Sequence, residues 1–146
     1  ESVDGLHGGA EARAIAALPP FPAERAAELC HRLVMQVLPG LAERDFARFA
    51  DGLTAIQDAN GRYFAPAQGG GMYVSRVVGR VLAFVRERCA SAVGQSSWGP
   101  TGFAIVASQA IADDMMAALR DAGATDLDLD TLAVTAWQHA APRLGR

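Results

Sequence analysis

The stretch ASAVGQSSWGPTGFAIVA, residues 90–107, decides the fold of this chain. Two short, largely apolar runs, 90–95 and 102–107, lie on either side of a turn rich in Ser, Gly and Pro. Such a pattern is typical of two strands joined by a loop. We therefore predict two strands here, and a last strand over 131–137, where apolar and polar residues alternate.

Outside these strands, the spacing of apolar residues predicts helices. In residues 23–38 they recur at intervals of three and four, which is typical of a helix with one buried face. That stripe consists of Ala26, Leu29, Cys30, Leu33, Val34, Val37 and Leu38, and Pro39-Gly40 is predicted to end the helix. Further helices are predicted over 10–18, 42–63, 74–89 and 109–122, the last capped by Ser108 and closed by Gly123, with a loop over 65–71.

The order of these elements favours the α+β class. Helices outnumber strands, and the strands come late in the chain, on either side of a helix. We expect an antiparallel sheet of about four strands, covered by helices on one face. A length of 146 residues suits a single domain, 1–146, because one hydrophobic core usually spans roughly 100–200 residues.

The charge composition excludes several functions. All 13 positively charged residues are Arg, against 16 acidic ones, so the formal charge is −3. Without Lys, the chain can form neither a P-loop, which needs a phosphate-binding Lys, nor a Schiff base with a substrate carbonyl. No cluster of positive charge indicates a nucleic-acid partner, and no apolar run approaches the roughly 20 residues of a membrane span.

The two cysteines, Cys30 and Cys89, lie on predicted apolar helical faces, where a free cysteine behaves as a small buried hydrophobic residue. No secretory signal precedes them, so we expect a reducing, cytoplasmic setting. Because the chain begins at Glu1 rather than Met, we also expect it to be a piece of a longer protein.

Two sets of residues resemble metal ligands, and neither predicts a metal site. Asp126, Asp128 and Asp130 have the spacing that opens a calcium-binding loop, but the glycine and the bidentate glutamate that such a loop requires are missing. We expect these carboxylates on the wet side of an exposed strand edge. The three histidines, which lack metal-ligand spacing, are His7, His31 and His139.

The turn between the two predicted strands is unusually polar. It presents Gln95, Ser96, Ser97 and Thr101 together with Trp98, an aromatic residue that is costly to expose. Hydroxyls and successive backbone N–H groups in such a loop can bind an anion, and an indole can stack on a planar ring. Alternatively, the turn is a tight hairpin whose Trp98 packs onto the core as a lid. Composition alone favours neither interpretation.

Three segments resemble the β-ribofuranosylaminobenzene 5′-phosphate synthase family of the GHMP kinase superfamily. The most specific is the string from Gly94 to Ala104, with its Gln-Ser-Ser-Trp-Gly-Pro-Thr run. Gly5-Leu6-His7-Gly8-Gly9 with Glu11 is similar to the glycine-rich opening of that family's second half, and Tyr63-Phe64-Ala65-Pro66-Ala67-Gln68-Gly69-Gly70 to its Gln-Gly-Gly loop. The similarity covers most of residues 5–122. The superfamily's N-terminal nucleotide loop has no counterpart, and the tail after Gly123 matches weakly.

The resemblance implies the C-terminal, ferredoxin-like domain of a two-domain enzyme. Such synthases join phosphoribosyl pyrophosphate to 4-aminobenzoate, with loss of CO₂ and pyrophosphate, in the biosynthesis of methanopterin-type cofactors for one-carbon metabolism. The resemblance further implies Mg²⁺ in the complete enzyme but none bound by this domain alone, a separate N-terminal domain as partner, and the option of a homodimer. The implied substrate-binding residues are His7, Gln68, Gly69, Gly70, Gln95, Ser96, Ser97, Trp98, Gly99 and Thr101, and the catalytic residues are not identified.

Two other functions stay open at this point. The same domain can serve an ATP-dependent small-molecule kinase, although Trp98-Gly99-Pro100 departs from the glycine-rich third motif of such kinases. It can also be a non-enzymatic module for ligand binding or dimerisation, because the chain has no nucleotide loop. In either enzyme reading, we expect the isolated chain to be inactive.

Overall fold

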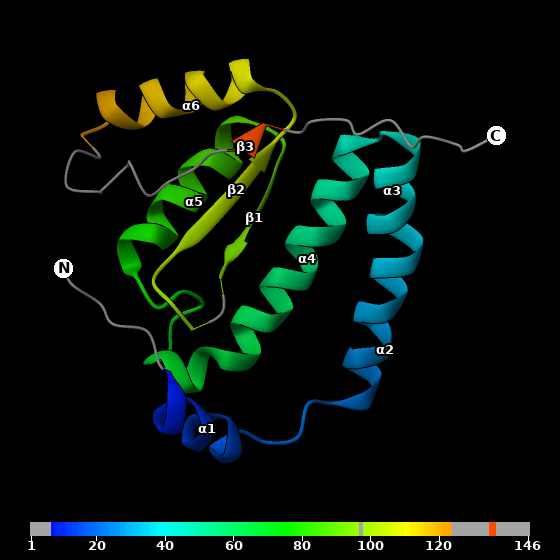
Figure 1. Ribbon diagram of the computed structural model, residues 1–146, viewed down its shortest axis with the longest axis vertical. Coiled ribbons are helices and arrows are strands. Elements are labelled where there is room, and N and C mark those ends of the chain that lie inside the picture. Colours follow the sequence, from blue (N-terminus) through cyan, green and yellow to red (C-terminus); the bar gives the residue numbers. More distant parts are fainter. Residues whose placement is uncertain (1–6, 97, 124–134, 137–146) are drawn as a thin grey trace.

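The computed structural model describes residues 7–96, 98–123 and 135–136, and its architecture is α+β (Figure 1). The elements are α1 (Gly8–Ala17), α2 (Ala23–Arg32), the π-helical segment η1 (Leu33–Val37), α3 (Leu38–Glu43), α4 (Phe46–Phe64), the 3₁₀ turn η2 (Ala65–Gln68), α5 (Arg76–Arg88), β1 (Ser91–Gln95), β2 (Gly102–Val106), α6 (Gln109–Asp121) and β3 (Thr135–Ala136).

The two strands predicted around the polar turn are confirmed as a hairpin. β1 and β2 pair antiparallel, from Ser91 opposite Val106 to Gln95 opposite Gly102. The two residues of β3 pair with β2 in the parallel direction, so the strand order is β1-β2-β3. The described residues therefore show a hairpin with a short parallel addition, not the expected antiparallel sheet of about four strands.

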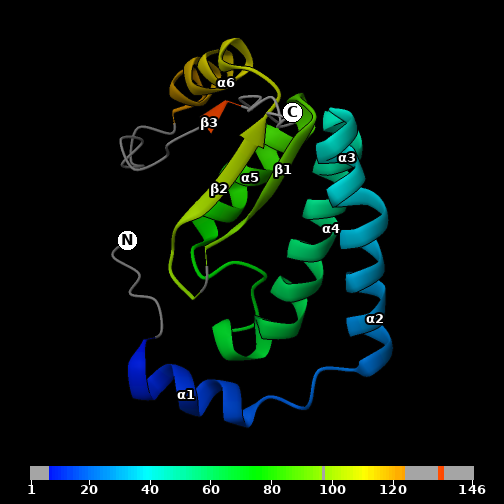
Figure 2. The ribbon, with the colours of Figure 1, turned by 45° about the vertical axis from the view of Figure 1, so that its right-hand side comes forward.

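Helices cover both faces of this sheet, rather than the one face expected. Ala92 and Val93 are neighbours in β1 and point to opposite faces, yet both are 0% exposed. Val93 shares a core with Leu82 of α5 and Leu119 of α6, whereas Ala92 shares a second core with Phe49 of α4. Figures 1 and 2 show the hairpin between α4 on one side and α5 on the other.

α4 also satisfies the outer edge of β1. Thr54 of α4 is buried, and its Oγ1 accepts a hydrogen bond from the N–H of Val93 at 3.2 Å. The same hydroxyl lies 3.3 Å from the carbonyl oxygen of Ser91, to which it donates. Because a strand edge with partners of this kind is not open to another strand, the helix both packs on β1 and closes its edge.

Pro39-Gly40 does not end the first long helical segment, so that prediction is wrong. Leu38–Glu43 forms α3, which continues the π-helical segment η1 without a break and holds Pro39 in its first turn. The chain turns instead at Arg44, which has a φ of 62°. Asp45 then caps α4, so this helix begins at Phe46 rather than at the predicted residue 42.

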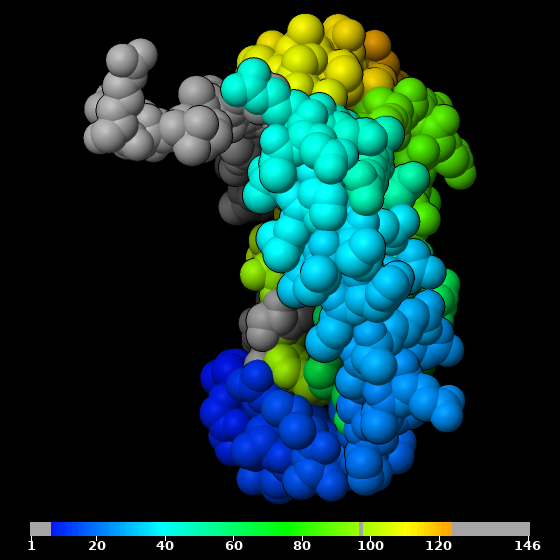
Figure 3. All heavy atoms as spheres, turned by 90° about the vertical axis from the view of Figure 1, so that its right-hand side faces the viewer, coloured from blue at the N-terminus to red at the C-terminus, as the bar shows by residue number. Residues whose placement is uncertain are grey.

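The apolar stripe predicted to be buried on residues 23–38 is mostly exposed. Val37 is buried and packs against α4, and Cys30 is exposed although we expected it inside; Cys89 is half-buried. The large apolar side chains between 43% and 56% exposed on this arm are Leu33, Val34, Met35, Leu38 and Leu41. We call these five residues the outer face of η1–α3; the helical arm that carries them faces the viewer in Figure 3.

The remaining helices follow the predictions with shifts of a few residues. α5 begins at Arg76, after Ser75, whose hydroxyl accepts a hydrogen bond from the N–H of Val78 at 3.3 Å. Ser108 caps α6 as predicted, and Gly123 follows that helix with a φ of 77°. The predicted loop over 65–71 contains η2.

None of the helices in the described part of the chain has the length and hydropathy that crossing a membrane requires. Asp126, Asp128, Asp130 and His139 lie outside the described residues.

Candidate functional site

A cavity of about 260 Å³ lies where four parts of the chain meet. These parts are the C-terminal turns of α4, η2, the segment that leads into α5, and the connection between β1 and β2. The lining residues are Gln57, Asn60, Gly61, Phe64, Gln68, Met72, Tyr73, Gln95 and Trp98. Two of the segments singled out in the sequence, the Gln-Gly-Gly loop and the polar hairpin turn, thus contribute to one cavity.

A direct hydrogen bond joins those two segments. The Nε2 of Gln95, at the end of β1, donates to Oε1 of Gln68 in η2 at 2.8 Å. The Oε1 of Gln95 accepts from the backbone N–H of Val74 at 2.7 Å. One side chain on the hairpin therefore holds both η2 and the segment before α5 in place around the cavity.

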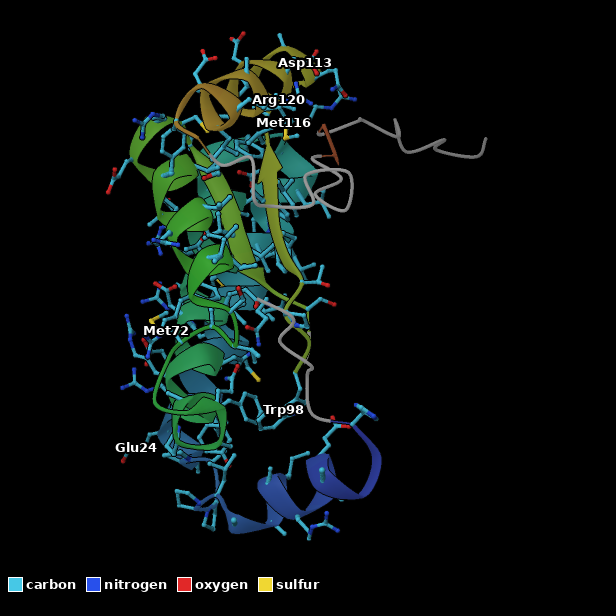
Figure 4. The ribbon with its side chains drawn as sticks, turned by 90° about the vertical axis from the view of Figure 1, so that its left-hand side faces the viewer. Glu24, Met72, Trp98, Asp113, Met116 and Arg120 are labelled. Carbon is cyan, nitrogen blue, oxygen red and sulfur yellow. The ribbon has the colours of Figure 1, made fainter. Side chains whose placement is uncertain are left out.

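Trp98 combines the two roles that the sequence left open. It is 7% exposed, and its ring lies edge-on to Phe64 with centroids 4.7 Å apart at an interplanar angle of 61°. Figure 4 shows the indole reaching from the hairpin connection toward the end of α4. It packs onto α4 as a lid would, and it also lines the cavity.

Two glycines make room for the cavity wall. A β-carbon at Gly94 of β1 would lie 2.5 Å from Oε1 of Gln57, so the absent side chain lets this carboxamide lie against the strand. A β-carbon at Gly61 of α4 would lie 3.0 Å from the carbonyl oxygen of Met72. The close approach of β1 and of the 72–74 segment to α4 therefore depends on these two positions.

The sequence analysis missed the contribution of α4 to this site. Gln57, Asn60, Gly61 and Phe64 have the spacing i, i+3, i+4 and i+7, which places them along one face of the helix. Two carboxamides and a glycine on one helix face, next to the apolar face that is buried, are the sequence signal that could have indicated this part of the site. Tyr73 and Met72 were also missed, and they follow directly after the Gln-Gly-Gly loop.

The cavity is polar but carries no charged side chain. Its polar groups are the carboxamides of Gln57, Asn60, Gln68 and Gln95 and the phenol of Tyr73. Burial raises the pKa of Tyr73 above its ordinary value of 10.0, the negative charge of Asp58 adds to this, and Arg86 opposes it. Tyr73 is therefore a neutral phenol at physiological pH, and the lining is uncharged throughout.

Part of the polar turn lies outside this cavity. Ser96 and Thr101 are exposed, and the N–H of Ser96 donates to the carbonyl of Thr101 at 2.9 Å. The N–H of Gly99 donates to the carbonyl of Ser96 at 3.3 Å. These two N–H groups close the turn, so they do not form the anion-binding nest that the sequence suggested. Ser97 lies outside the described residues.

The other predicted site residues lie at the surface. Gly69 and Gly70 are exposed, with φ values of 73° and 88°, and the N–H of Gly70 donates to the carbonyl of Ala65 at 2.8 Å. Their role in the structure is to turn the chain after η2, which positions Gln68 at the cavity. His7 is the exposed residue before α1 and is not among the lining residues.

A second cavity, of about 410 Å³, lies on a neighbouring face of α4, beside Asp58, Arg86 and Cys89. Two of its three charged residues are paired, since Arg86 Nη1 and Asp58 Oδ1 are 3.3 Å apart; the third is Asp51. Burial raises the pKa of Cys89, which keeps its thiol protonated. Across the described ranges, no group of three or more His, Cys, Asp or Glu is placed to hold a metal ion.

Comparison with protein families gives one match. The family model described as GHMP kinases C terminal matches residues 37–125, which is more than half of the chain. No curated protein and no solved structure gives a significant match. The matched range runs from the end of η1 through α6 and includes every residue that lines the 260 Å³ cavity. The chain thus belongs to the family of GHMP kinase C-terminal domains.

Proposed function

We propose that this chain is the C-terminal domain of a synthase that joins phosphoribosyl pyrophosphate to 4-aminobenzoate, with loss of CO₂ and pyrophosphate, in the biosynthesis of methanopterin-type cofactors. The observation that supports this best is the 2.8 Å hydrogen bond between Gln68 and Gln95, which are 27 residues apart. Each belongs to a segment that resembles the synthase family, and the two segments meet at a single cavity.

The proposed reaction balances without a redox partner. The bond between ribose C1 and the pyrophosphate oxygen breaks, and its electron pair leaves with pyrophosphate. The ring carbon that carries the carboxylate attacks C1, and a carbon–carbon bond forms. The bond to the carboxylate then breaks, CO₂ departs, and the electron pair restores the aromatic ring.

The residues of this domain would contribute binding and orientation. Trp98 and Phe64 offer an apolar wall to the aromatic ring, and the linked carboxamides of Gln68 and Gln95 fix the shape of the cavity. The exposed hydroxyls of Ser96 and Thr101 are available to an anionic group outside it. A divalent ion would neutralise pyrophosphate in the complete enzyme, and we assign it to residues outside the described part of this domain.

The partners proposed with this function are a preceding domain of the same enzyme and, as the other option, a second copy of the chain. Enzymes of two domains commonly form their substrate cleft at the domain interface. The outer face of η1–α3 is apolar and about half exposed, and such a face is typical of an interaction surface. We propose a cytoplasmic setting, since the substrates are small intracellular metabolites.

The second candidate function is an ATP-dependent small-molecule kinase, which the family match itself favours. Both functions are tested by one assay. The complete gene product is incubated with phosphoribosyl pyrophosphate, carboxyl-labelled 4-aminobenzoate and Mg²⁺, and labelled CO₂ and pyrophosphate are measured. We expect equal amounts of the two products, formed only when both substrates are present.

Two results would contradict the proposal. ADP formed from ATP with a small-molecule alcohol, without any CO₂ release, would establish the kinase. Binding of 4-aminobenzoate without turnover of either kind would establish a non-enzymatic module.

A further inference from the structure

We infer that the 260 Å³ cavity receives the uncharged amine end of an aromatic ring, while the charged groups of both substrates stay outside it. This inference rests on the proposed function and deepens it, because it assigns the direction in which 4-aminobenzoate enters. It is argued from the charge, the hydrogen-bonding groups and the size of the cavity.

The charge of the lining excludes an anionic occupant. None of the nine lining residues is Asp, Glu, His or Arg. A carboxylate or phosphate placed among them would lose its water without gaining an ionic partner, which is strongly unfavourable. The N–H groups of Ser96 and Gly99, which would have offered compensation, are bonded within their own turn. The anionic groups of the substrates are therefore expected outside the cavity, at the exposed hydroxyls of Ser96 and Thr101, in the solvent or on another domain.

The hydrogen-bonding groups of the lining suit an aromatic amine. The carboxamides of Gln57 and Asn60 find no hydrogen-bond partner among the described residues, and both lie on the cavity face of α4. Each offers an acceptor oxygen, as an aryl N–H requires, and a donor nitrogen as well. Gly94 leaves the space that Gln57 occupies, so this carboxamide is held at the wall by close packing.

The size and the walls of the cavity suit one ring. An engineered apolar cavity of about 150 Å³ is enough to bind benzene. The 260 Å³ found here therefore accommodates one substituted ring, and not the ribose and pyrophosphate as well. Trp98, Phe64 and Tyr73 line it, and aromatic side chains bind a planar ring by offset stacking or edge-to-face contact.

The chemistry of the reaction fixes which end of the ring points inward. The carbon that attacks the ribose is the one that carries the carboxylate, so it must face the second substrate at the open side of the cavity. The amine is para to that carbon and therefore lies deepest. A carboxamide oxygen that accepts a hydrogen bond from the aryl N–H increases electron release to the para carbon, and this favours the attack.

The direct test is binding of small probes to the isotope-labelled 146-residue chain, followed by NMR. Aniline is expected to shift the indole N–H of Trp98 and the side-chain amides of Gln57 and Asn60, with saturation in the millimolar range. Benzoate and inorganic pyrophosphate should leave these signals in place. Aniline without effect up to its solubility limit, or benzoate acting at concentrations as low as aniline, would overturn the inference.

Leucine substitutions keep the bulk of the wall and remove its hydrogen bonds. In Gln57→Leu and in Asn60→Leu, the preference for aniline over toluene should fall about fivefold, which is the usual effect of losing one hydrogen bond. Binding of toluene shows that the variant is folded. Gln109→Leu, on the exposed start of α6, is the matched control and should keep the preference. An unchanged preference in both cavity variants would refute the assignment.

The two proposals fail in different ways. If the complete enzyme releases no CO₂ but aniline still shifts Trp98, the proposed function falls and the cavity remains a site for aromatic amines. If CO₂ is released and aniline leaves the cavity signals unchanged, the synthase assignment stands and the direction of entry is wrong.

Discussion

Trp98 is buried against Phe64 and also lines the cavity, so its replacement should affect both stability and substrate binding. Trp98→Phe keeps an aromatic ring near Phe64, but the ring is smaller and makes less contact with Phe64 and with the cavity. We expect the free energy of unfolding to fall by roughly 1 kcal/mol, the usual worth of an aromatic pair. In the complete enzyme, KM for 4-aminobenzoate should rise severalfold, as measured by initial rates. A loss of stability with an unchanged KM would show that Trp98 is only a lid.

Tyr73 couples the stability of the site to pH. Its pKa is raised above 10.0, mainly by burial and further by the charge of Asp58, with Arg86 acting in the opposite direction. The folded chain therefore holds this proton more tightly than the unfolded chain. The resulting stabilisation is complete below the unfolded pKa and is lost as pH rises through the folded pKa.

Chemical denaturation at a series of pH values measures this effect. Above pH 10.0, the free energy of unfolding should fall more steeply in the unmodified chain than in Tyr73→Phe. Curves that stay parallel through this range would show that the phenol makes no contribution.

Some of the residues that the sequence assigned to substrate binding meet in the structure, and their role in binding stays a prediction. The sequence placed Gln68, Gln95 and Trp98 at one site, and the structure brings all three to one cavity. Neighbouring residues at the end of a strand point to opposite sides, so Ser96 and Ser97 are predicted to direct one hydroxyl toward the protein and the other toward the substrate. Ser96 is exposed, and Ser97 lies outside the described residues, so this assignment stays a prediction.

At the scale of elements, local signals located the helices and strands, while burial was less predictable. The hairpin and α6 follow from apolar runs, a turn and the Ser108 cap, all of which act within a few residues. The stripe on residues 23–38 correctly indicates a helical path. It cannot indicate which other element covers it, because burial depends on contacts distant in sequence. Of the stripe, Val37 is buried against α4, whereas Leu33, Val34 and Leu38 are exposed.

The turn between α3 and α4 and the wall of the cavity also could not be predicted from local sequence signals. The helical path continues through Pro39 after the π-helical segment η1, so the sequence alone could not place the corner at Arg44. Gln57 and Asn60 acquire their role only because η2 and β1 fold against the same face of α4. The sequence shows that both residues lie on one face of a helix, but it does not show that η2 and β1 pack against that face.

A pair of neighbouring substitutions tests the burial assigned to this arm. Val37 is 6% exposed and Leu38 is 50% exposed. Val37→Ala should lower the free energy of unfolding by about 2 kcal/mol, because it removes buried methyl groups and leaves a cavity. Leu38→Ala should change it by less than about 0.5 kcal/mol, as expected for a surface position. Urea denaturation measures both, and similar losses at the two positions would show that the stripe is buried as the sequence suggested.

At the scale of the whole molecule, the chain combines a built cavity with an absence of charged residues inside it. Phosphoribosyl pyrophosphate carries several negative charges that this cavity cannot neutralise. We therefore expect residues 1–146 alone to unfold cooperatively on heating and to release no CO₂ from 4-aminobenzoate, even with Mg²⁺ and both substrates. The measurement is a labelled CO₂ assay on the purified chain. CO₂ release by this chain alone would contradict the proposal that a second domain is needed to bind the anionic groups of the substrates.

We propose that the Gln-Gly-Gly loop and the polar hairpin turn form one substrate site, joined by Gln68 and Gln95. A double-mutant cycle of Gln68→Leu and Gln95→Leu, with KM for 4-aminobenzoate as the readout in the complete enzyme, tests it most directly. Residues in direct contact typically show a coupling energy of about 0.5–3 kcal/mol. We predict that the double variant has a KM close to that of the worse single variant. Additive effects of the two substitutions, or no effect of either, would contradict the account.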